Sequence, residues 1–370
     1  MRVRDQRQGW LNPGLERPIA PGSTRKISGC IKSLSSAASM RAAEMGDSVD
    51  PWRVPFCDGN SIPILGLGTC SLDKPVKGET VKAVKAGIEI GYRHFDGALM
   101  YGNEDEVGEA IRAKIADGTV KREDIFYTSK LWMSYLSPAL VQKGLELTLK
   151  SLKLDYIDLF LIHWPTGLEL SEGVLFPQDA SGKILLSDVD FCETWAVMES
   201  CKDAGLVRSI GVSNFNHKQL ETLLRMPKLK YRPVCNQVEC HPYLNQSKLL
   251  KYCKSNNIVL VGYSPLGTSQ DPAWFDPNNP ILLNDPELRK IGEKHNKTAA
   301  QVALRYQIQR DVVVIPKSFN PGRMKQNKEI FDFQLTNEEM KAIDGINKNL
   351  RYITLKQLID HPKYPFHEEY

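Results

Sequence analysis

The sequence predicts an α/β protein whose ordered part is a (β/α)8 TIM barrel. Segments patterned as strands and helices alternate regularly along the chain, which is typical of a parallel sheet. Eight such units span roughly 270 residues, near the usual barrel length of about 250. The strands are almost continuous apolar runs, as expected when helices cover the sheet. Gly66-Leu67-Gly68 lacks both a third glycine and a following helix, so the Rossmann dinucleotide fingerprint is absent.

Composition narrows the classes of partner. The 370 residues are 42% hydrophobic and 25% charged, as in soluble globular proteins, and the formal net charge is only +4. Nucleic-acid binding would require clustered basic residues, and no apolar run approaches the roughly 20 residues of a membrane span. We therefore expect no nucleic-acid or membrane partner. Nothing in the sequence predicts an obligate interface between copies, so we also expect a monomer.

The eight cysteines are scattered and form no CxxC pair, which argues against a disulfide framework or a zinc site. They favour a reducing compartment, and the predicted location is the cytoplasm. Cys240-His241 has no second ligand pair at metal-binding spacing, so we interpret it as structural and predict no metal.

Residues 1–46 are predicted to be a disordered basic extension, and residues 47–370 the folded domain. The extension is rich in Arg, Lys, Pro, Gly and Ser and shows no hydrophobic period. The alternative is an organelle transit peptide, although Pro13, Pro18 and Pro21 would interrupt its amphipathic helix. A secretory signal is not expected, because no apolar core segment is present.

The first half of the domain begins with a hairpin around Asp58-Gly59-Asn60, a good turn sequence. Asn103 is the expected N-cap of a helix with acidic residues in its first turn, and Ser137 the N-cap of a helix with Pro138 at its first position. An irregular loop, 164–186, interrupts the alternation. The expected strands are 64–69, 93–96, 125–130, 157–163 and 207–213, and the expected helices are 78–90, 103–117, one from 137, 191–204 and one from 216.

The second half repeats the alternation. A second long loop covers 264–283, and Thr336 and Glu339 form a capping-box pattern before the last helix. An aromatic-rich tail, 351–370, closes the chain. The expected strands are 233–239, 258–263 and 312–316, and the expected helices are 246–256, 286–295, 298–309, one from 321 and one from 336.

Polar residues close three consecutive strands: Asp96 the second, Lys130 the third and His163 the fourth. Tyr101 follows just past the second strand. Singly, each has a structural reading, such as a helix cap, a solvated lysine or a satisfied histidine. At the same end of adjacent barrel strands, where barrel enzymes build their active sites, they form a candidate catalytic group.

This group suits carbonyl reduction by hydride, which needs a proton donor for the oxygen. A free tyrosine has a pKa of about 10, and we expect the Lys130 ammonium to lower the pKa of Tyr101. Asp96 would hold Lys130 charged and oriented. His163 can hydrogen-bond the substrate oxygen as charge develops.

A candidate phosphate site lies at the end of the last strand. Lys317-Ser318 closes that strand, Asn320 is the expected N-cap of the next helix, and Arg323 lies in the first turn. Free N–H groups, the helix dipole and cations together favour an anion. The alternative is a solvated basic turn.

A candidate amide site lies between the fifth and sixth strands. Ser213, Asn214 and Gln237 present hydroxyl and amide groups that could bind a carboxamide, although Ser213 and Asn214 could instead cap the following helix. Tyr263, at the end of the seventh strand, offers a flat face for stacking.

Three stretches, 91–108, 210–215 and 314–318, resemble the signatures of the aldo-keto reductases, and the resemblance covers residues 54–370. It implies NADPH/NADP+ bound at the barrel mouth, with Asp96, Tyr101, Lys130 and His163 as the catalytic tetrad. The cofactor contacts that the resemblance implies are Gly68, Thr69, Ser213, Asn214, Gln237, Tyr263, Ser264, Leu266, Lys317, Ser318, Arg323, Gln326 and Asn327.

Within that family, the sequence is most similar to the hydroxysteroid dehydrogenase and prostaglandin F synthase branch. The segments CKDAGLVRSIGVSNFN and HPKYPFHEEY carry this similarity. The related steroid 5β-reductases have glutamate where His163 stands, so histidine implies reduction of ketones or aldehydes. Cys70 departs from the tyrosine usual in relatives. By resemblance, an apolar substrate pocket would be lined by Met100, Trp132, Trp164 and Trp274, with Leu99 and residues 352–355. These aromatics could equally be ordinary core.

The predicted function is NADPH-dependent reduction of ketones and aldehydes, on steroids, prostaglandins or other lipophilic carbonyls. One alternative is an aldose-reductase-like enzyme for small aldehydes and sugars. Another is an NADPH-binding module without catalysis, as in lens crystallins and channel subunits of this fold. The tetrad favours an enzyme, while the exact substrate cannot be read from the sequence.

Overall fold

The computed structural model describes residues 52–71, 76–171, 173–268 and 276–370. The expected N-terminal extension, the domain boundary at 46/47 and Trp274 lie outside the described residues. In the part described, no helix is long and apolar enough to cross a membrane.

Eight parallel strands form the centre of the fold, in the order β3-β4-β5-β6-β9-β10-β11-β12. Two parallel bridges, Leu65 to Val314 and Gly68 to Lys317, join the first strand to the last and close the barrel. A Cβ at Gly68 would come within 2.9 Å of the Ile315 carbonyl oxygen, so this closure needs glycine. The predicted TIM barrel is confirmed. Its strands are β3 (Leu67–Gly68), β4 (His94–Asp96), β5 (Phe126–Leu131), β6 (Ile157–Ile162), β9 (Val207–Ser213), β10 (Cys235–Glu239), β11 (Val259–Tyr263) and β12 (Val313–Val314).

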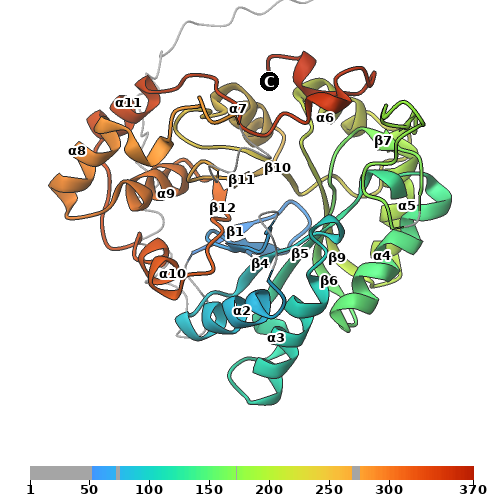
Figure 1. Ribbon diagram of the computed structural model, residues 1–370, viewed down its shortest axis with the longest axis horizontal. Coiled ribbons are helices and arrows are strands. Elements are labelled where there is room, and N and C mark those ends of the chain that lie inside the picture. Colours follow the sequence, from blue (N-terminus) through green and yellow to red (C-terminus); the bar gives the residue numbers. More distant parts are fainter. Residues whose placement is uncertain (1–51, 72–75, 172, 269–275) are drawn as a thin grey trace, which may run out of the picture. The chain divides into compact units, whose positions relative to one another are not determined.

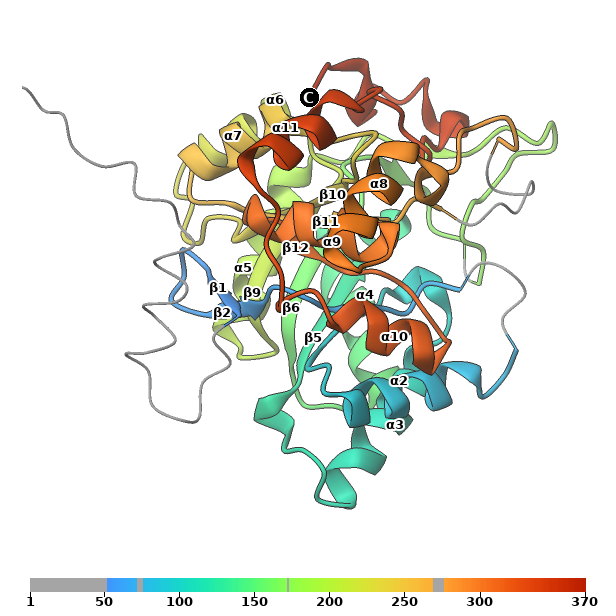
Figure 2. The same cartoon turned by 90° about the vertical axis from the view of Figure 1, so that its left-hand side faces the viewer.

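Helices surround the strands (Figure 1). They are α2 (Glu79–Ile90), α3 (Glu104–Ala116), α4 (Pro138–Leu152), α5 (Phe191–Asp203), α6 (His217–Leu224), α7 (Ser247–Ser255), α8 (Pro286–His295), α9 (Ala299–Gln309), α10 (Pro321–Lys328) and α11 (Asn337–Gly345). The predicted hairpin is confirmed as β1 (Arg53–Pro55) paired antiparallel with β2 (Ser61–Pro63). In Figure 2 it lies on the opposite side of the barrel from the long green loop, which carries the antiparallel pair β7 (Gly167–Leu168) and β8 (Leu186–Ser187).

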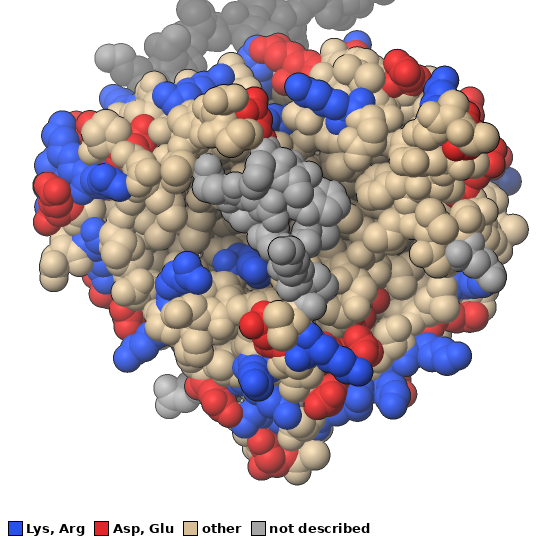
Figure 3. Space-filling model, viewed as in Figure 1, with Lys and Arg blue, Asp and Glu red and all other residues tan. Residues whose placement is uncertain are grey.

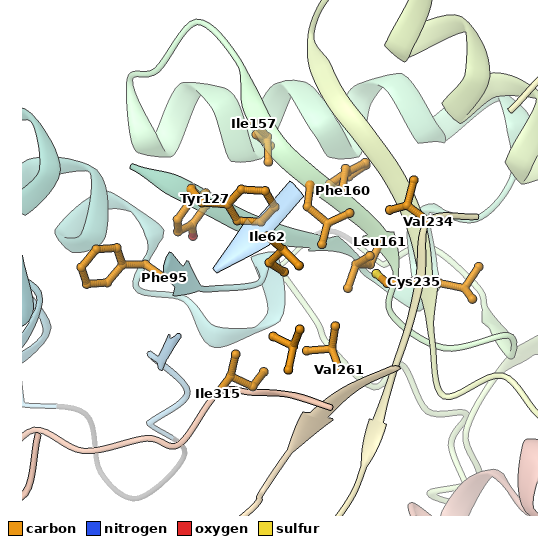
Figure 4. Packing of buried hydrophobic residues seen from close by; sticks show 14 of the residues in the cluster. Ile62, Phe95, Tyr127, Ile157, Phe160, Leu161, Val234, Cys235, Val261 and Ile315 are labelled. Carbon is orange, nitrogen blue, oxygen red and sulfur yellow. The ribbon is translucent and has the colours of Figure 1, made fainter. Parts of the chain in front are cut away.

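The core fills the barrel and the layer between strands and helices. Every residue of β5, β6 and β10 is buried, which agrees with their apolar runs. Figure 4 shows Ile62, Leu161 and Val261, from different strands, gathered near one another, while Phe95 points away from them. Close packing of this kind leaves the strand ends and the loops beyond them to build a site.

The helix starts confirm some capping predictions and correct others. Asn320 accepts from the Arg323 N–H, and Thr336 forms a capping box with Glu339. Asn103 and Ser137 occupy the predicted N-cap positions, but neither side chain accepts a hydrogen bond from its helix. The predicted positions were right, and the predicted capping hydrogen bonds were wrong.

Strand limits were overestimated at the closing seam. The strands predicted at 64–69 and 312–316 are two residues long each, because single bridges continue the pairing where the barrel closes.

Candidate active site

The predicted catalytic residues meet at the C-terminal ends of three neighbouring strands. Asp96 ends β4, Lys130 is the penultimate residue of β5, and His163 directly follows β6. Tyr101 ends the short 3-10 helix η1 (Leu99–Tyr101), which begins three residues after β4. The register pairs β4 with β5 and β5 with β6, so the sheet itself places these side chains side by side.

Lys130 is the centre of the group. Its Nζ donates to Asp96 Oδ1 at 2.5 Å, to the Gly97 carbonyl at 2.7 Å and to Tyr101 Oη at 3.4 Å. The Lys130 and Asp96 side chains are 1% and 3% exposed. A Cβ at Gly97 would collide with the hydroxyl of Tyr127, so only glycine lets this carbonyl face the ammonium. The buried ion pair is thus matched by further hydrogen bonds, as a desolvated pair requires.

The expected fall in the pKa of Tyr101 is not found. Burial raises the pKa of Tyr101 well above its usual range, and the neighbouring Cys70 and Asp96 raise it further. The prediction counted the charge of Lys130 but not the loss of water around the phenol or the acidic groups behind it. Tyr101 is therefore a neutral phenol that holds a proton at physiological pH. Lys130, 3.4 Å away, stands where it can stabilise the phenolate that forms when the proton leaves.

His163 is neutral as well. Burial lowers its pKa well below the usual range, and the charge of Lys130 acts in the same direction. Its ring lies edge-on to Tyr101, with centroids 6.0 Å apart. Its buried Nδ1 has no hydrogen-bond partner among the described residues. A neutral imidazole beside the phenol can donate a hydrogen bond to a substrate oxygen without bringing in a second charge.

The predicted amide group surrounds this centre, but its hydrogen bonds are internal. Gln237 Nε2 donates to Asp96 Oδ2 at 2.8 Å, and Asn214 Nδ2 donates to the His163 carbonyl at 3.0 Å. Ser213 Oγ donates to the Gln237 carbonyl, and Tyr263 Oη donates to Asn214 Oδ1 at 2.8 Å. Neither Ser213 nor Asn214 caps α6, since Asn216 does so. Asn214 has a φ of 60°, a conformation that asparagine adopts more readily than most residues.

Glu104 is a buried acid near the catalytic group that the sequence did not identify as a site residue. It was predicted only as one of the acidic residues in the first turn of a helix, and it is 3% exposed. Ser129 Oγ and Tyr127 Oη donate to its Oε1 at 2.6 and 3.1 Å, and burial raises the pKa of its carboxyl. No sequence signal separates it from the acidic residues that follow, because only the register of α3 against β5 buries it.

The candidate phosphate site has the expected composition. Lys317 and Arg323 are exposed, and Ser318 is buried with its hydroxyl in the turn that starts α10. Neither cation forms an ion pair with a described carboxylate, and the Lys317 ammonium lies over the Phe319 ring at 4.4 Å. Figure 3 shows basic side chains gathered over the region of α10, beside the central hollow. Unpaired cations at a helix N-terminus suit a phosphate.

The remaining predicted cofactor residues lie around the same mouth. The backbone N–H and the side-chain hydroxyl of Thr69 both donate hydrogen bonds to the Asp96 carbonyl, at 3.0 and 2.9 Å. Ser264 has a φ of 49°, directly after β11, and Leu266 is half-buried two residues later. In α10, Gln326 is exposed and Asn327 is 5% exposed.

Most of the predicted substrate residues that the structure describes lie in one apolar cluster, whereas Tyr352 packs in a neighbouring one. Trp132 and Trp164, 1% and 3% exposed, belong to its buried part, and Met100 and Leu99 pack against it. The Trp132 ring lies edge-on to His163, with centroids 5.3 Å apart. The C-terminal tail completes the cluster with Ile353, Leu355, Leu358, Tyr364 and Phe366. We call this set the apolar wall.

Cys240-His241 has a structural role. His241 Nε2 lies 2.8 Å from Glu239 Oε1, and both side chains are fully buried. Among the described residues, no group of three or more His, Cys, Asp or Glu side chains could hold a metal ion.

Comparison with known proteins gives a consistent result. Residues 64–348 match the model of the Aldo/keto reductase family. The chain is 59% identical to bovine prostaglandin F synthase 2 and 58% identical to bovine dihydrodiol dehydrogenase 3. It is 56% identical to human aldo-keto reductase family 1 member C4. Each alignment spans 318 residues, 86% of this chain and 98% of the relative.

Proposed function

Because the chain belongs to the aldo/keto reductase family, we propose that it reduces ketones and aldehydes to alcohols with NADPH, acting on steroids, prostaglandins or other lipophilic carbonyls. The observation that carries the proposal is the buried contact of Lys130 with both Asp96 and Tyr101. We also propose that the enzyme is a monomer in the cytoplasm.

When bound, NADPH would supply the hydride for the carbonyl carbon, and the chain's own residues act on the carbonyl oxygen. Tyr101, a neutral phenol, donates its proton to the oxygen as negative charge develops there. Lys130 stabilises the phenolate left behind, and Asp96 holds the Lys130 side chain in place through their ion pair. His163, a neutral imidazole, donates a second hydrogen bond to the same oxygen. The buried setting strengthens each of these interactions.

The residues present fit NADPH. Lys317 and Arg323, which form no ion pair with a carboxylate of the described ranges, lie beside the N-terminus of α10 and suit the extra phosphate that distinguishes NADPH from NADH. Ser213, Asn214 and Gln237 would hold the carboxamide, and Tyr263 would stack on its ring. Gly68, Thr69, Ser264, Leu266, Ser318, Gln326 and Asn327 complete the proposed contacts.

The apolar wall supports a lipophilic substrate. Trp132, Trp164 and Met100 stand beside the catalytic group and offer almost no polar atoms, which favours steroids or prostaglandins over sugars. Trp274 is proposed to join them. The names of the similar bovine proteins, a prostaglandin F synthase and a dihydrodiol dehydrogenase, agree with this substrate class.

The test is to assay the purified full chain for NADPH oxidation with a saturated steroid ketone, a keto prostaglandin and glyceraldehyde in parallel. We expect a higher kcat/KM for the lipophilic ketones. Preference for glyceraldehyde would favour the aldose-reductase-like alternative. Tight NADPH binding without turnover on any of them would contradict the proposal and favour a binding module.

A further inference from the structure

Glu239 is a buried acid that the proposed reaction does not use. It is the last residue of β10, is fully buried, and lies two residues beyond Gln237. A carboxylate in such a place is costly unless its oxygens accept hydrogen bonds. The partners of this side chain therefore reveal what it holds in place.

Two of those partners are backbone groups from the far end of the chain. Tyr352 N donates to Glu239 Oε1 at 2.8 Å, and Ile353 N donates to Oε2 at 2.9 Å. His241 Nε2 makes a third contact, at 2.8 Å to Oε1. Just upstream, the N–H groups of Lys348 and Leu350 both donate to the Tyr243 carbonyl. The carboxylate thus ends a short ladder that fastens the C-terminal segment to the end of β10.

Tyr352 extends this attachment to the loop after β11. Its ring packs on His241, with centroids 4.9 Å apart, and its hydroxyl donates to the Pro280 carbonyl at 2.8 Å. A Cβ at Gly267 would lie 3.8 Å from the Tyr352 ring, so the ring also borders the segment that carries Ser264 and Leu266. One fastened residue therefore contacts both parts of the second long loop that the structure describes.

The apolar wall begins where the attachment ends. Ile353 packs against the cluster that contains Trp132 and Trp164, and Leu355 and Leu358 follow directly. Two residues before Glu239, in the middle of β10, Gln237 donates a hydrogen bond to Asp96. Strand β10 therefore connects Asp96 with the tail half of the apolar wall through two residues, Gln237 and Glu239. The tail half consists of Ile353, Leu355, Leu358, Tyr364 and Phe366.

We propose that Glu239 is a positioning residue that fixes the tail half of the apolar wall relative to the catalytic group and so sets the preference for bulky carbonyl substrates. This inference rests on the proposed function. A small aldehyde, which does not need the tail half of the wall, should be insensitive to the attachment.

Glu239→Gln tests it. The amide replaces one acceptor oxygen with an NH2 group that faces a donor, which removes one hydrogen bond to the C-terminal segment. We expect the KM for a saturated steroid ketone to rise about tenfold, as loss of a charge-assisted hydrogen bond would give. The kcat for glyceraldehyde should stay within about twofold of the unmodified protein, since small substrates rely on the catalytic group. Hydrogen exchange should accelerate at residues 352–358.

Glu199→Gln is the matched control. Glu199 is 9% exposed, and its Oε1 accepts from the N–H groups of Lys230 and Tyr231, both at 2.8 Å, before β10 begins. One amide oxygen can still accept both of these hydrogen bonds, so the variant replaces a mostly buried carboxylate with an amide at the opposite end of the barrel and releases no part of the C-terminal segment. This control should leave both the KM for the steroid ketone and the kcat for glyceraldehyde unchanged.

Glu239→Asp keeps the carboxylate and should fall between the unmodified protein and the Gln variant, which preserves the test if the Gln variant does not fold. Equal losses on both substrates, or unchanged steroid KM and exchange in Glu239→Gln, would overturn the inference. If the unmodified protein reduces no carbonyl, the proposed function fails instead, and the exchange measurement still decides whether Glu239 holds the segment.

Discussion

At the residue scale, the site depends on a proton held by Tyr101 rather than on a charge stored there. Burial and nearby acidic groups raise the pKa of Tyr101, while burial and Lys130 lower the pKa of His163. Both groups are therefore neutral at physiological pH. The acid is strong enough only at the moment of reaction, when charge on the oxygen accepts the proton and Lys130 stabilises the phenolate.

This arrangement predicts a flat pH profile for kcat/KM in reduction. Raising the pH removes activity when the phenol ionises, and a raised pKa moves that loss upward, beyond the usual value of about 10. A lowered pKa of His163 likewise removes any titration of that residue near 6.5. A steady-state series across neutral and mildly alkaline pH checks this. A fall assignable to Tyr101 near neutral pH would mean that Lys130 lowers its pKa after all.

The four catalytic candidates could be chosen from the sequence because barrel topology brings strand ends together. The protonation state of Tyr101 could not be predicted from the sequence. Its pKa depends on burial and on the neighbouring Cys70 and Glu104, and no local sequence pattern shows where those two residues lie. Glu239 was also unpredictable, since its donors lie 113 and 114 residues away. Long-range hydrogen bonds to backbone leave no trace in residue type.

At the element scale, the start of α10 is the proposed phosphate site. Lys317→Met and Arg323→Met should each raise the Kd for NADPH by about tenfold, as loss of a charge-assisted contact would give, and change the Kd for NADH little. Fluorescence titration with both cofactors measures this. Lys341→Met, on α11, is the control for charge. Equal losses for NADPH and NADH would mean that the phosphate binds elsewhere.

Helix limits followed from local chemistry, whereas strand limits depended on partners. The ends of α8 were predicted to the residue, because Asp285 and Pro286 define its start and Asn296 its end. Asn103 failed as a cap because its amide donates to the Thr69 carbonyl at 2.9 Å, a tertiary contact near the catalytic group. The strands where the barrel closes were overestimated because their pairing beyond two residues consists of isolated bridges rather than a continuous ladder.

At the scale of the whole molecule, the similarity to known relatives covers most, but not all, of the chain. The aligned 318 residues cover 98% of the bovine synthase but 86% of this chain. The sequence predicts that residues 1–46 are an extension outside the folded domain, so removing residues 1–45 should leave kcat and KM within about twofold. Parallel assays of the full and shortened chains check this. A loss of turnover would give the extension a role in catalysis or folding.

The central claim, that Tyr101 is the proton donor, is tested most directly by Tyr101→Phe. Tyr231→Phe is the control, since that hydroxyl bonds Asp203 on an exposed surface. We predict that Tyr101→Phe lowers kcat for reduction by at least about a hundredfold, as loss of a general acid would, with the Kd for NADPH nearly unchanged. A kcat comparable to that of the control would contradict the account.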